Sequence, residues 1–261
     1  STSDSSMGQF DQLSILFASS LFMMLGGIPF FLFVRLLNGQ VQPILRDQQI
    51  RFFLKFLLLI ACLITIYRVV NEGAFPIDAF VHALFNVTSV VTTTGYASQD
   101  YSLWGPFVVV LFFFLTFVGG CSGSTSGGMK MFRFQLSMLL LREQVLRLLH
   151  PNAVIARHYN GRIISDEIVA SSVAFSFIFL ATLAVVAAIL AALGLDLVTS
   201  LTGAATALAN VGPGLGDTIG PAGNFQTLPD GAKWVLMAAM LLGRLELLSV
   251  FVMFSPHFWR S

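Results

Sequence analysis

The sequence predicts an all-α integral membrane protein, with repeated units of span, short re-entrant pore helix and span around a central ion pathway. Of the 261 residues, 56% are hydrophobic and only 10% are charged, with a mean hydropathy of +0.83. Soluble domains carry roughly 25% charged residues, and one soluble core of this size could not bury all 26 phenylalanines. The other two observations are an uneven distribution of charge and a repeated apolar segment that ends in a glycine turn.

Four apolar stretches are long enough to cross a bilayer, which takes roughly 20 residues. They are residues 10–37, 52–70, 168–193 and 233–254. A fifth stretch, residues 106–141, has the length to cross but is interrupted in the middle. We therefore expect four complete spans and one broken one.

Charge assigns a side to each connection between the spans. One connection is surrounded by Arg35, Arg46, Arg51 and Lys55, and another holds Arg142, Arg147, Arg157 and Arg162, so both are expected on the cytoplasmic side. The opposite connections are acidic, with Glu72, Asp78, Asp100, Asp196, Asp217 and Asp230 among their residues. An acidic mouth attracts cations, although outer loops poor in basic residues are also common without any role in transport. The net charge of +1 gives no basic patch for nucleic acid.

Two connections on the acidic side contain a matching segment. These are FPIDAFVHALFNVTSVVTTTGYASQD (residues 75–100) and LDLVTSLTGAATALANVGPGLGD (residues 195–217). Each has about 15 moderately apolar residues, a length typical of a re-entrant helix rather than a span. Aligning Gly95 with Gly212 also aligns Asp100 with Asp217. Residues 1–7 resemble residues 97–103, so the chain is expected to begin just after another such turn.

The glycine turns are the candidate ion-binding elements. Non-helical backbone at membrane depth must be buried in protein or line water, and its carbonyl oxygens can replace the hydration shell of a cation. Glycine allows the backbone angles that this requires, and threonine adds hydroxyl oxygens. The candidate filter residues are Thr93, Thr94, Gly95 and Tyr96 in one turn, and Asn210, Val211, Gly212 and Pro213 in the other. The alternative is that each glycine simply ends a short helix.

The interruption of the fifth stretch reads GGCSGSTSGGMK, residues 119–130. About 13 residues precede it, too few to span at ~1.5 Å per residue, so it is expected at membrane depth. Its glycines and hydroxyl residues predict a flexible segment that needs protein or water around it. An ordinary helix-hairpin loop is the alternative.

Two cations accompany this segment. Arg244 lies near the centre of a predicted span, where a charge is costly and usually functional. Glu246 projects from another face of the helix, so a pair between the two is not expected. Arg244 could instead pair with a carboxylate of another helix purely for packing, and Lys130, at the end of the segment, could extend to the cytoplasmic surface.

Several segments together resemble the Trk/Ktr/HKT superfamily of potassium transporters, most closely its bacterial Trk branch. They are NVTSVVTTTGYAS (86–98), GGCSGSTSGGMK (119–130), ANVGPGLG (209–216) and MLLGRLELLSVFVMFSPHFWR (240–260). In this family four units surround one pore and each contributes one filter glycine. The resemblance makes residues 1–37 the outgoing helix of an incomplete second unit. It makes residues 38–165 a third unit with a broken second helix and a cytoplasmic loop, and residues 166–261 a fourth. The first half of the pore would then be missing.

The resemblance implies a multi-pass protein of the bacterial inner membrane that takes up potassium, with potassium held at Thr94, Gly95, Val211 and Gly212. It implies that an intramembrane loop below the filter obstructs the pore and moves during gating. The gating residues would be Gly119, Gly120, Ser122, Gly123, Ser124, Thr125, Ser126, Gly127, Gly128, Lys130 and Arg244.

The resemblance also implies a homodimer on a cytosolic TrkA-like ring of nucleotide-binding regulatory subunits. The nucleotide, NAD or ATP, would belong to that ring, and we expect no cofactor in this chain. A secondary transporter, proton- or sodium-coupled, and a non-conducting scaffold remain as alternatives. We do not expect an enzyme, because the sequence has no GxGxxG with an acidic partner, no P-loop, no HExxH and no CxxC.

Overall fold

The computed structural model describes residues 6–10, 12–150 and 157–245, and nearly all of their regular structure is helical. The α-helices are α1 (Leu13–Gly26), α2 (Phe30–Leu37), α3 (Gln42–Arg46), α4 (Gln48–Glu72), α5 (Pro76–Val91), α6 (Pro106–Phe117), α7 (Met131–Leu149), α8 (Asp166–Ala192), α9 (Leu197–Ala209) and α10 (Asp230–Arg244). A short 3₁₀ helix, η1 (Tyr101–Leu103), precedes α6, and the strands β1 (His158–Tyr159) and β2 (Arg162–Ile163) form a hairpin. The hairpin and α3 lie in connections for which the sequence predicted no regular structure.

Two of the predicted spans are confirmed as single long apolar helices. Within the described residues, α4 and α8 have 25 and 27 residues and are long and apolar enough to cross a membrane. Only 33% and 28% of their most apolar windows are buried inside the chain, so most of their surface is available to lipid or to other protein. Helix α10 covers the start of the span predicted at 233–254, whose remainder lies outside the described residues.

The segment predicted as one crossing, residues 10–37, is sharply bent in the structure. The segment is two helices, α1 and α2, bent by 97° at a break between them. Pro29 precedes the first residue of α2, and proline cannot continue a helix because it lacks the N–H and its ring clashes with the preceding turn. Gly27 sits at the bend in tight contact, since a Cβ there would lie 2.8 Å from the ring of Phe53. Composition alone did not reveal that the apolar run changes direction.

The two predicted short helices are confirmed, and both are enclosed by protein. Helices α5 and α9 have 16 and 13 residues, and each is buried on nearly all faces, α5 by α1, α4 and α6 and α9 by α6, α8 and α10. Thus α5 and α9 contrast with α4 and α8, whose outer faces are exposed. Helices α5 and α9 are thus too short to cross a membrane and are enclosed by other helices, as expected of re-entrant helices.

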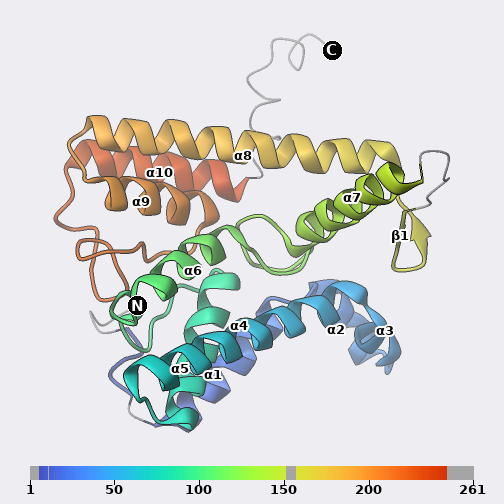
Figure 1. Cartoon of the computed structure of the whole chain (residues 1–261), viewed down its shortest axis with the longest axis horizontal. Helices are drawn as coiled ribbons and strands as arrows, with labels where there is room; N and C mark the ends of the chain where they lie inside the picture. The colour runs from blue at the N-terminus through green and yellow to red at the C-terminus, as the bar shows by residue number, and fades with distance from the viewer. Residues whose placement is uncertain (1–5, 11, 151–156, 246–261) are drawn as a thin grey trace.

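The break in the fifth apolar stretch is also confirmed. Helix α6 ends at Phe117 and α7 begins at Met131, with the glycine-rich loop, residues 119–130, between them. Figure 1 shows α8, α9 and α10 grouped on one side of the molecule and α1 to α5 on the other, with α6, this loop and α7 between the groups. Each side has its own hydrophobic core, one around Phe53, Val87 and Phe112 and the other around Phe179, Leu190 and Leu208. The glycine-rich loop belongs to the Gly95 unit (α4 to α7) and lies between the helices of that unit and those of the Gly212 unit (α8 to α10).

Candidate functional site: two glycine turns over a glycine-rich loop

The Gly95 turn, residues 93–96, follows the C-terminal end of α5. Its first residue, Thr93, has a positive φ of 55° and Gly95 one of 77°. The amides of Thr94 and Gly95 both donate to the carbonyl of Ser89, at 2.8 and 3.3 Å. These bonds satisfy the last carbonyls of the helix and leave the turn's own carbonyls free to face elsewhere. Thr94 and Tyr96 are exposed, whereas Gly95 is half-buried.

The Gly212 turn, residues 210–213, repeats this backbone geometry after α9. Asn210 has a φ of 56° and Gly212 one of 119°, matching Thr93 and Gly95. The Val211 amide donates to the Thr206 carbonyl at 3.0 Å, as the Thr94 amide does to Ser89 in the other turn. The Gly212 amide donates to the Thr206 hydroxyl at 2.9 Å. Thr206 and Ser89 occupy equivalent places when the glycines are aligned, so the repeat seen in the sequence extends to backbone conformation and hydrogen bonding.

The two turns meet although they are far apart in the sequence. A Cβ added to Gly212 would lie 3.8 Å from the Cα of Gly95. A Cβ added to Gly95 would overlap the carbonyl oxygen of Val211, so this approach is open only to glycine. Both turns also follow helix C-terminal ends, whose partial negative charge favours a cation. The structure thus brings the eight candidate filter residues together at the junction of the two units.

The glycine-rich loop is held by its own hydrogen bonds. Its two ends pair, because the Gly119 amide donates to the Met129 carbonyl at 2.8 Å and the Met131 amide donates to the Gly120 carbonyl at 3.0 Å. Inside the loop, the Ser126 hydroxyl accepts from the Gly120 amide at 2.9 Å. Serines and glycines therefore build a compact loop that satisfies its buried backbone without helix or sheet.

The same loop contacts both glycine turns. The Gly127 amide donates to the Thr93 hydroxyl at 2.8 Å. A Cβ at Gly127 would overlap the carbonyl oxygen of Ala209, the last residue of α9, and would lie 3.2 Å from the Cβ of Asn210. The loop is consequently packed against the ends of both short helices, directly beside the turns.

On its other side the loop is bound to the α1–α2 bend and to α4. The Cys121 amide donates to the Gly27 carbonyl at 2.9 Å, and the Phe30 amide donates to the Gly123 carbonyl at 2.9 Å. The Ser122 amide donates to Gln49 Oε1 at 3.2 Å. The sequence analysis missed Gln49 and the bend, and the buried polar Gln49 near the start of an apolar helix is the signal that could have indicated the first of them.

Both cations singled out in the sequence contact the loop. Arg244, at the end of α10, donates from one guanidinium nitrogen to the Thr125 carbonyl at 2.9 Å. The Lys130 ammonium is turned back onto the loop, where it donates to the Ser126 carbonyl. In the structure both Lys130 and Arg244 thus have a backbone oxygen of the loop as a partner. Glu246 lies outside the described residues.

A cavity of about 250 Å³ lies where these groups converge. It is lined by loop residues 123–128 and by Lys130, Arg133, Phe175, Gly243 and Arg244. Arg133 lies 3.6 Å from the ring centre of Phe175, a further cation beside the loop that sequence reasoning did not select. A Cβ at Gly243 would overlap the Leu208 carbonyl, so α10 approaches α9 closely enough to bring Arg244 to the loop.

Comparison with known proteins assigns the family. The TrkH family, described as cation transport protein, matches residues 1–261. The chain belongs to the TrkH family. Among curated relatives, the Trk system potassium uptake protein TrkI of Halomonas elongata is 55% identical over 99% of this chain and 53% of its own length. The Trk system potassium uptake protein TrkH of Vibrio parahaemolyticus is 35% identical over 100% of this chain and 54% of its own.

A solved structure of the TrkH family has the same fold. The crystal structure of the potassium transporter TrkH from Vibrio parahaemolyticus matches with a TM-score of 0.93 and 32% identity, over 99% of this chain and 56% of that chain. The predicted fold class, a helical membrane protein of the TrkH type, is therefore confirmed. The chain spans about half the length of the curated TrkH-family relatives that it matches.

Proposed function

We propose that this chain is part of a protein that takes up potassium across the bacterial inner membrane, and that it contributes two of the elements of a selectivity filter. The observation that carries the proposal is the meeting of the Gly95 and Gly212 turns, each in the same backbone conformation. Potassium would be held by oxygens of Thr94, Gly95, Val211 and Gly212. The names of the relatives, potassium uptake proteins and a potassium transporter, support the choice of ion.

We further propose that the glycine-rich loop is the gate. The loop contacts Thr93 on one side and Arg244 on the other, so a movement of α10 or α7 would change its position beside the filter. Arg244 and Lys130 place two positive charges at loop carbonyls, and positive charge in the pathway raises the barrier to a cation. In the closed arrangement these contacts hold the loop in place.

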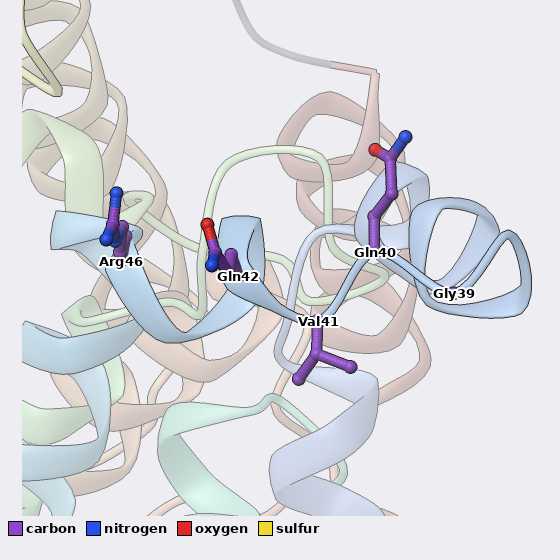
Figure 2. Close-up of a pocket in the computed structure, with 5 residues that line it drawn as sticks. All are labelled: Gly39, Gln40, Val41, Gln42 and Arg46. Carbon is purple, nitrogen blue, oxygen red and sulfur yellow. The ribbon is translucent and has the colours of Figure 1, made fainter.

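For partners, we propose the missing half of the pore, a second copy in a homodimer, and a cytosolic ring whose subunits bind NAD or ATP. The basic connections at residues 40–51 and 142–162 are the proposed contact surface for that ring. A cavity of about 560 Å³ is lined by Gly39, Gln40, Val41, Gln42 and Arg46. Figure 2 shows Gln40, Gln42 and Arg46 pointing to one side of this segment and Val41 to the other. The polar side chains are thus available together on one face.

The test is potassium-dependent growth of an uptake-deficient bacterium that expresses the full-length parent protein or the 261-residue chain. We expect the parent to restore growth and the short chain alone to remain silent, because half of a pore does not enclose a pathway. In the parent, Arg244→Ala should raise potassium flux, since the Thr125 carbonyl loses its charged partner.

A matched control for Arg244→Ala is Lys233→Ala, which removes one positive charge near the other end of α10, where Lys233 pairs with Asp230. It should leave flux unchanged. A parent protein that carries no potassium would contradict the proposed function, and an Arg244→Ala protein with unaltered flux would contradict the gating role alone.

A further inference from the structure

Behind the Gly95 turn lies a buried polar network that the proposed filter and gate do not use. It consists of His82 and Asn86, on successive turns of α5, and Ser98, three residues after Gly95; we call it the Ser98 network. The Ser98 amide donates to Asn86 Oδ1 at 3.1 Å, and Asn86 Nδ2 donates to Ser98 Oγ at 2.9 Å. His82 Nδ1 lies 2.8 Å from the same oxygen. All three residues are at most 9% exposed.

The direction of the bond between His82 and Ser98 is assigned by giving every buried polar group a partner. Ser98 Oγ accepts from Asn86 and needs an acceptor for its own proton, and His82 Nδ1 supplies that acceptor in the tautomer that carries its proton on Nε2. The ring proton of a neutral His82 then sits on Nε2, which faces the Asp78 carboxylate at 3.6 Å. With this arrangement both polar groups of Ser98 are satisfied by side chains of α5, and neither is left unpaired in a buried place.

The consequence for the Gly95 turn is attachment to α5 at both ends. Before the glycine, the Ser89 carbonyl accepts from the Thr94 and Gly95 amides. After the glycine, Asn86 and His82 hold Ser98. The carbonyls of Gly95 and Tyr96, which lie between these attachments, are therefore positioned by α5, whereas the next carbonyl, that of Ala97, accepts from the Met7 amide at 3.0 Å. A small displacement of Ser98 would change the distance from these oxygens to an ion, and ion discrimination depends on the number and field strength of such oxygens.

The Gly212 turn is attached differently. The Leu215 amide, equivalent to that of Ser98, donates to the Thr202 hydroxyl at 3.1 Å. The Gly212 turn is thus attached to α9 through the hydroxyl of Thr202, whereas the Gly95 turn is attached to α5 through the side chains of Asn86 and His82. The position equivalent to His82 is Thr199, which belongs to the first turn of α9 at Asp196. The two-residue support by His82 and Asn86 is therefore a feature of the Gly95 turn and not of the repeat.

We propose that His82 is a specificity-determining positioning residue, which acts through Ser98 to fix the carbonyl oxygens of the Gly95 turn. The inference rests on the proposed potassium filter and extends it to a residue that does not contact the ion. His82 contributes through the acceptor at Nδ1, so its effect should follow the position of that one atom rather than the size or charge of the side chain.

The experiment measures the potassium-over-sodium preference of uptake by the full-length protein in proteoliposomes, together with the maximal potassium flux. His82→Leu removes the acceptor at similar bulk. His82→Asn returns a polar atom to the place of Nδ1, whereas His82→Gln places its polar atoms further out, nearer the place of Nε2. Val81→Ala, which removes buried apolar contacts on the same helix, controls for general weakening of α5.

We expect His82→Leu and His82→Gln to lower the potassium-over-sodium preference several-fold while substantial flux remains, and His82→Asn and Val81→Ala to keep it near the parent value. If His82→Leu does not reach the membrane, the contrast between Asn and Gln still decides. Two results would overturn the inference and leave the proposed function standing. One is an equal potassium-over-sodium preference in the His82→Asn and His82→Gln proteins, and the other is a loss of preference in Val81→Ala as large as that in His82→Leu. A parent without potassium flux would overturn both.

Discussion

The Gly95 and Gly212 turns share a backbone and differ in what their side chains contact. In both turns, the residue two positions before the glycine has a positive φ. The amide of the residue directly before the glycine donates to a carbonyl of the preceding helix, that of Ser89 in α5 or of Thr206 in α9. The side chain of Thr93 accepts from the glycine-rich loop, whereas Asn210 donates to the Met240 carbonyl of α10 at 3.1 Å. The repeated backbone thus makes two equivalent turns, while one turn is joined to the loop and the other to the helix that carries Arg244.

The largest expected effect on ion preference comes from substituting one of the two turn glycines, Gly95. Gly95→Ser adds a Cβ at a φ of 77° and against the Val211 carbonyl, so it should displace oxygens of both turns at once. Backbone strain of this kind costs about 1–3 kcal/mol, and a free-energy difference of that size between the two bound ions corresponds to about 5- to 150-fold in preference. We expect a loss of potassium-over-sodium preference of that size, measured by competitive uptake in the full-length protein.

Gly212→Ser is the matched comparison. Its φ of 119° is also unfavourable for serine, but a Cβ there would meet only the Cα of Gly95, at an ordinary contact distance of 3.8 Å. The change in preference should therefore be smaller than for Gly95→Ser. Equal effects would mean that the close approach of Gly95 to Val211 is not what matters, and no effect of either would count against the filter assignment.

The next largest effect is expected at the contact between α7 and α8, the helices that connect the Gly95 and Gly212 units. Glu143 of α7 has a side chain only 2% exposed and bonds Arg157, which also pairs with Asp166 at the start of α8. The hydrogen bonds from Arg157 lower the pKa of Glu143 despite its burial. Glu143→Gln leaves Arg157 with Asp166 as a partner but removes its charged hydrogen bonds to Glu143, which contribute about 1.5–3 kcal/mol each. The substitution should therefore lower the melting temperature of the purified protein at neutral pH.

The pH dependence of that difference has a definite sign. Because the pKa of Glu143 is lower in the folded protein, its stabilising contribution is present above the unfolded value, near 4.5, and is lost as the pH falls through the folded one. The melting temperatures of the parent and Glu143→Gln proteins should therefore converge progressively as the pH falls below 4.5. Arg147→Gln removes a partner of Glu143 that is 52% exposed and should have little effect at any pH. A difference that is constant with pH would contradict the ion pair.

Much of the fold follows from patterns that the sequence displays directly. Apolar length predicted α4 and α8, the repeat predicted two short helices ending at Gly95 and Gly212, and the glycine-rich run predicted the break after α6. The bend before Pro29 was missed because the hydrophobicity of a segment does not indicate whether its helix axis is straight or bent. Pro29, two residues after the Gly26–Gly27 pair, is a local signal that could have divided that run.

The candidate site was predictable only in part, for a physical reason. Glycine and charge in an apolar background stand out, which is why Gly95, Gly212, Lys130 and Arg244 could be selected. His82, Asn86 and Gln49 matter through partners distant in sequence, and a single polar residue on an apolar helix does not reveal them. The ion-binding and gating roles themselves remain predictions, and the contacts of Thr93 offer the finest test of them.

The smallest expected effect isolates the bond between the Gly95 turn and the loop. Thr93→Val keeps the β-branched shape but removes the hydroxyl that accepts from the buried Gly127 amide at 2.8 Å. An unsatisfied buried donor costs about 1–3 kcal/mol, and this cost falls on the arrangement in which the loop lies beside the turn. We therefore expect the full-length protein with Thr93→Val, reconstituted alone in proteoliposomes, to leak several-fold more potassium than the unchanged full-length protein, measured as tracer flux. Thr93→Ser retains the hydroxyl and should leak no more than the parent. Equal leak from the Val and Ser variants would mean that the Thr93 hydroxyl does not hold the loop in place, and the Gly95 and Gly212 turns would then not differ in their coupling to the gate.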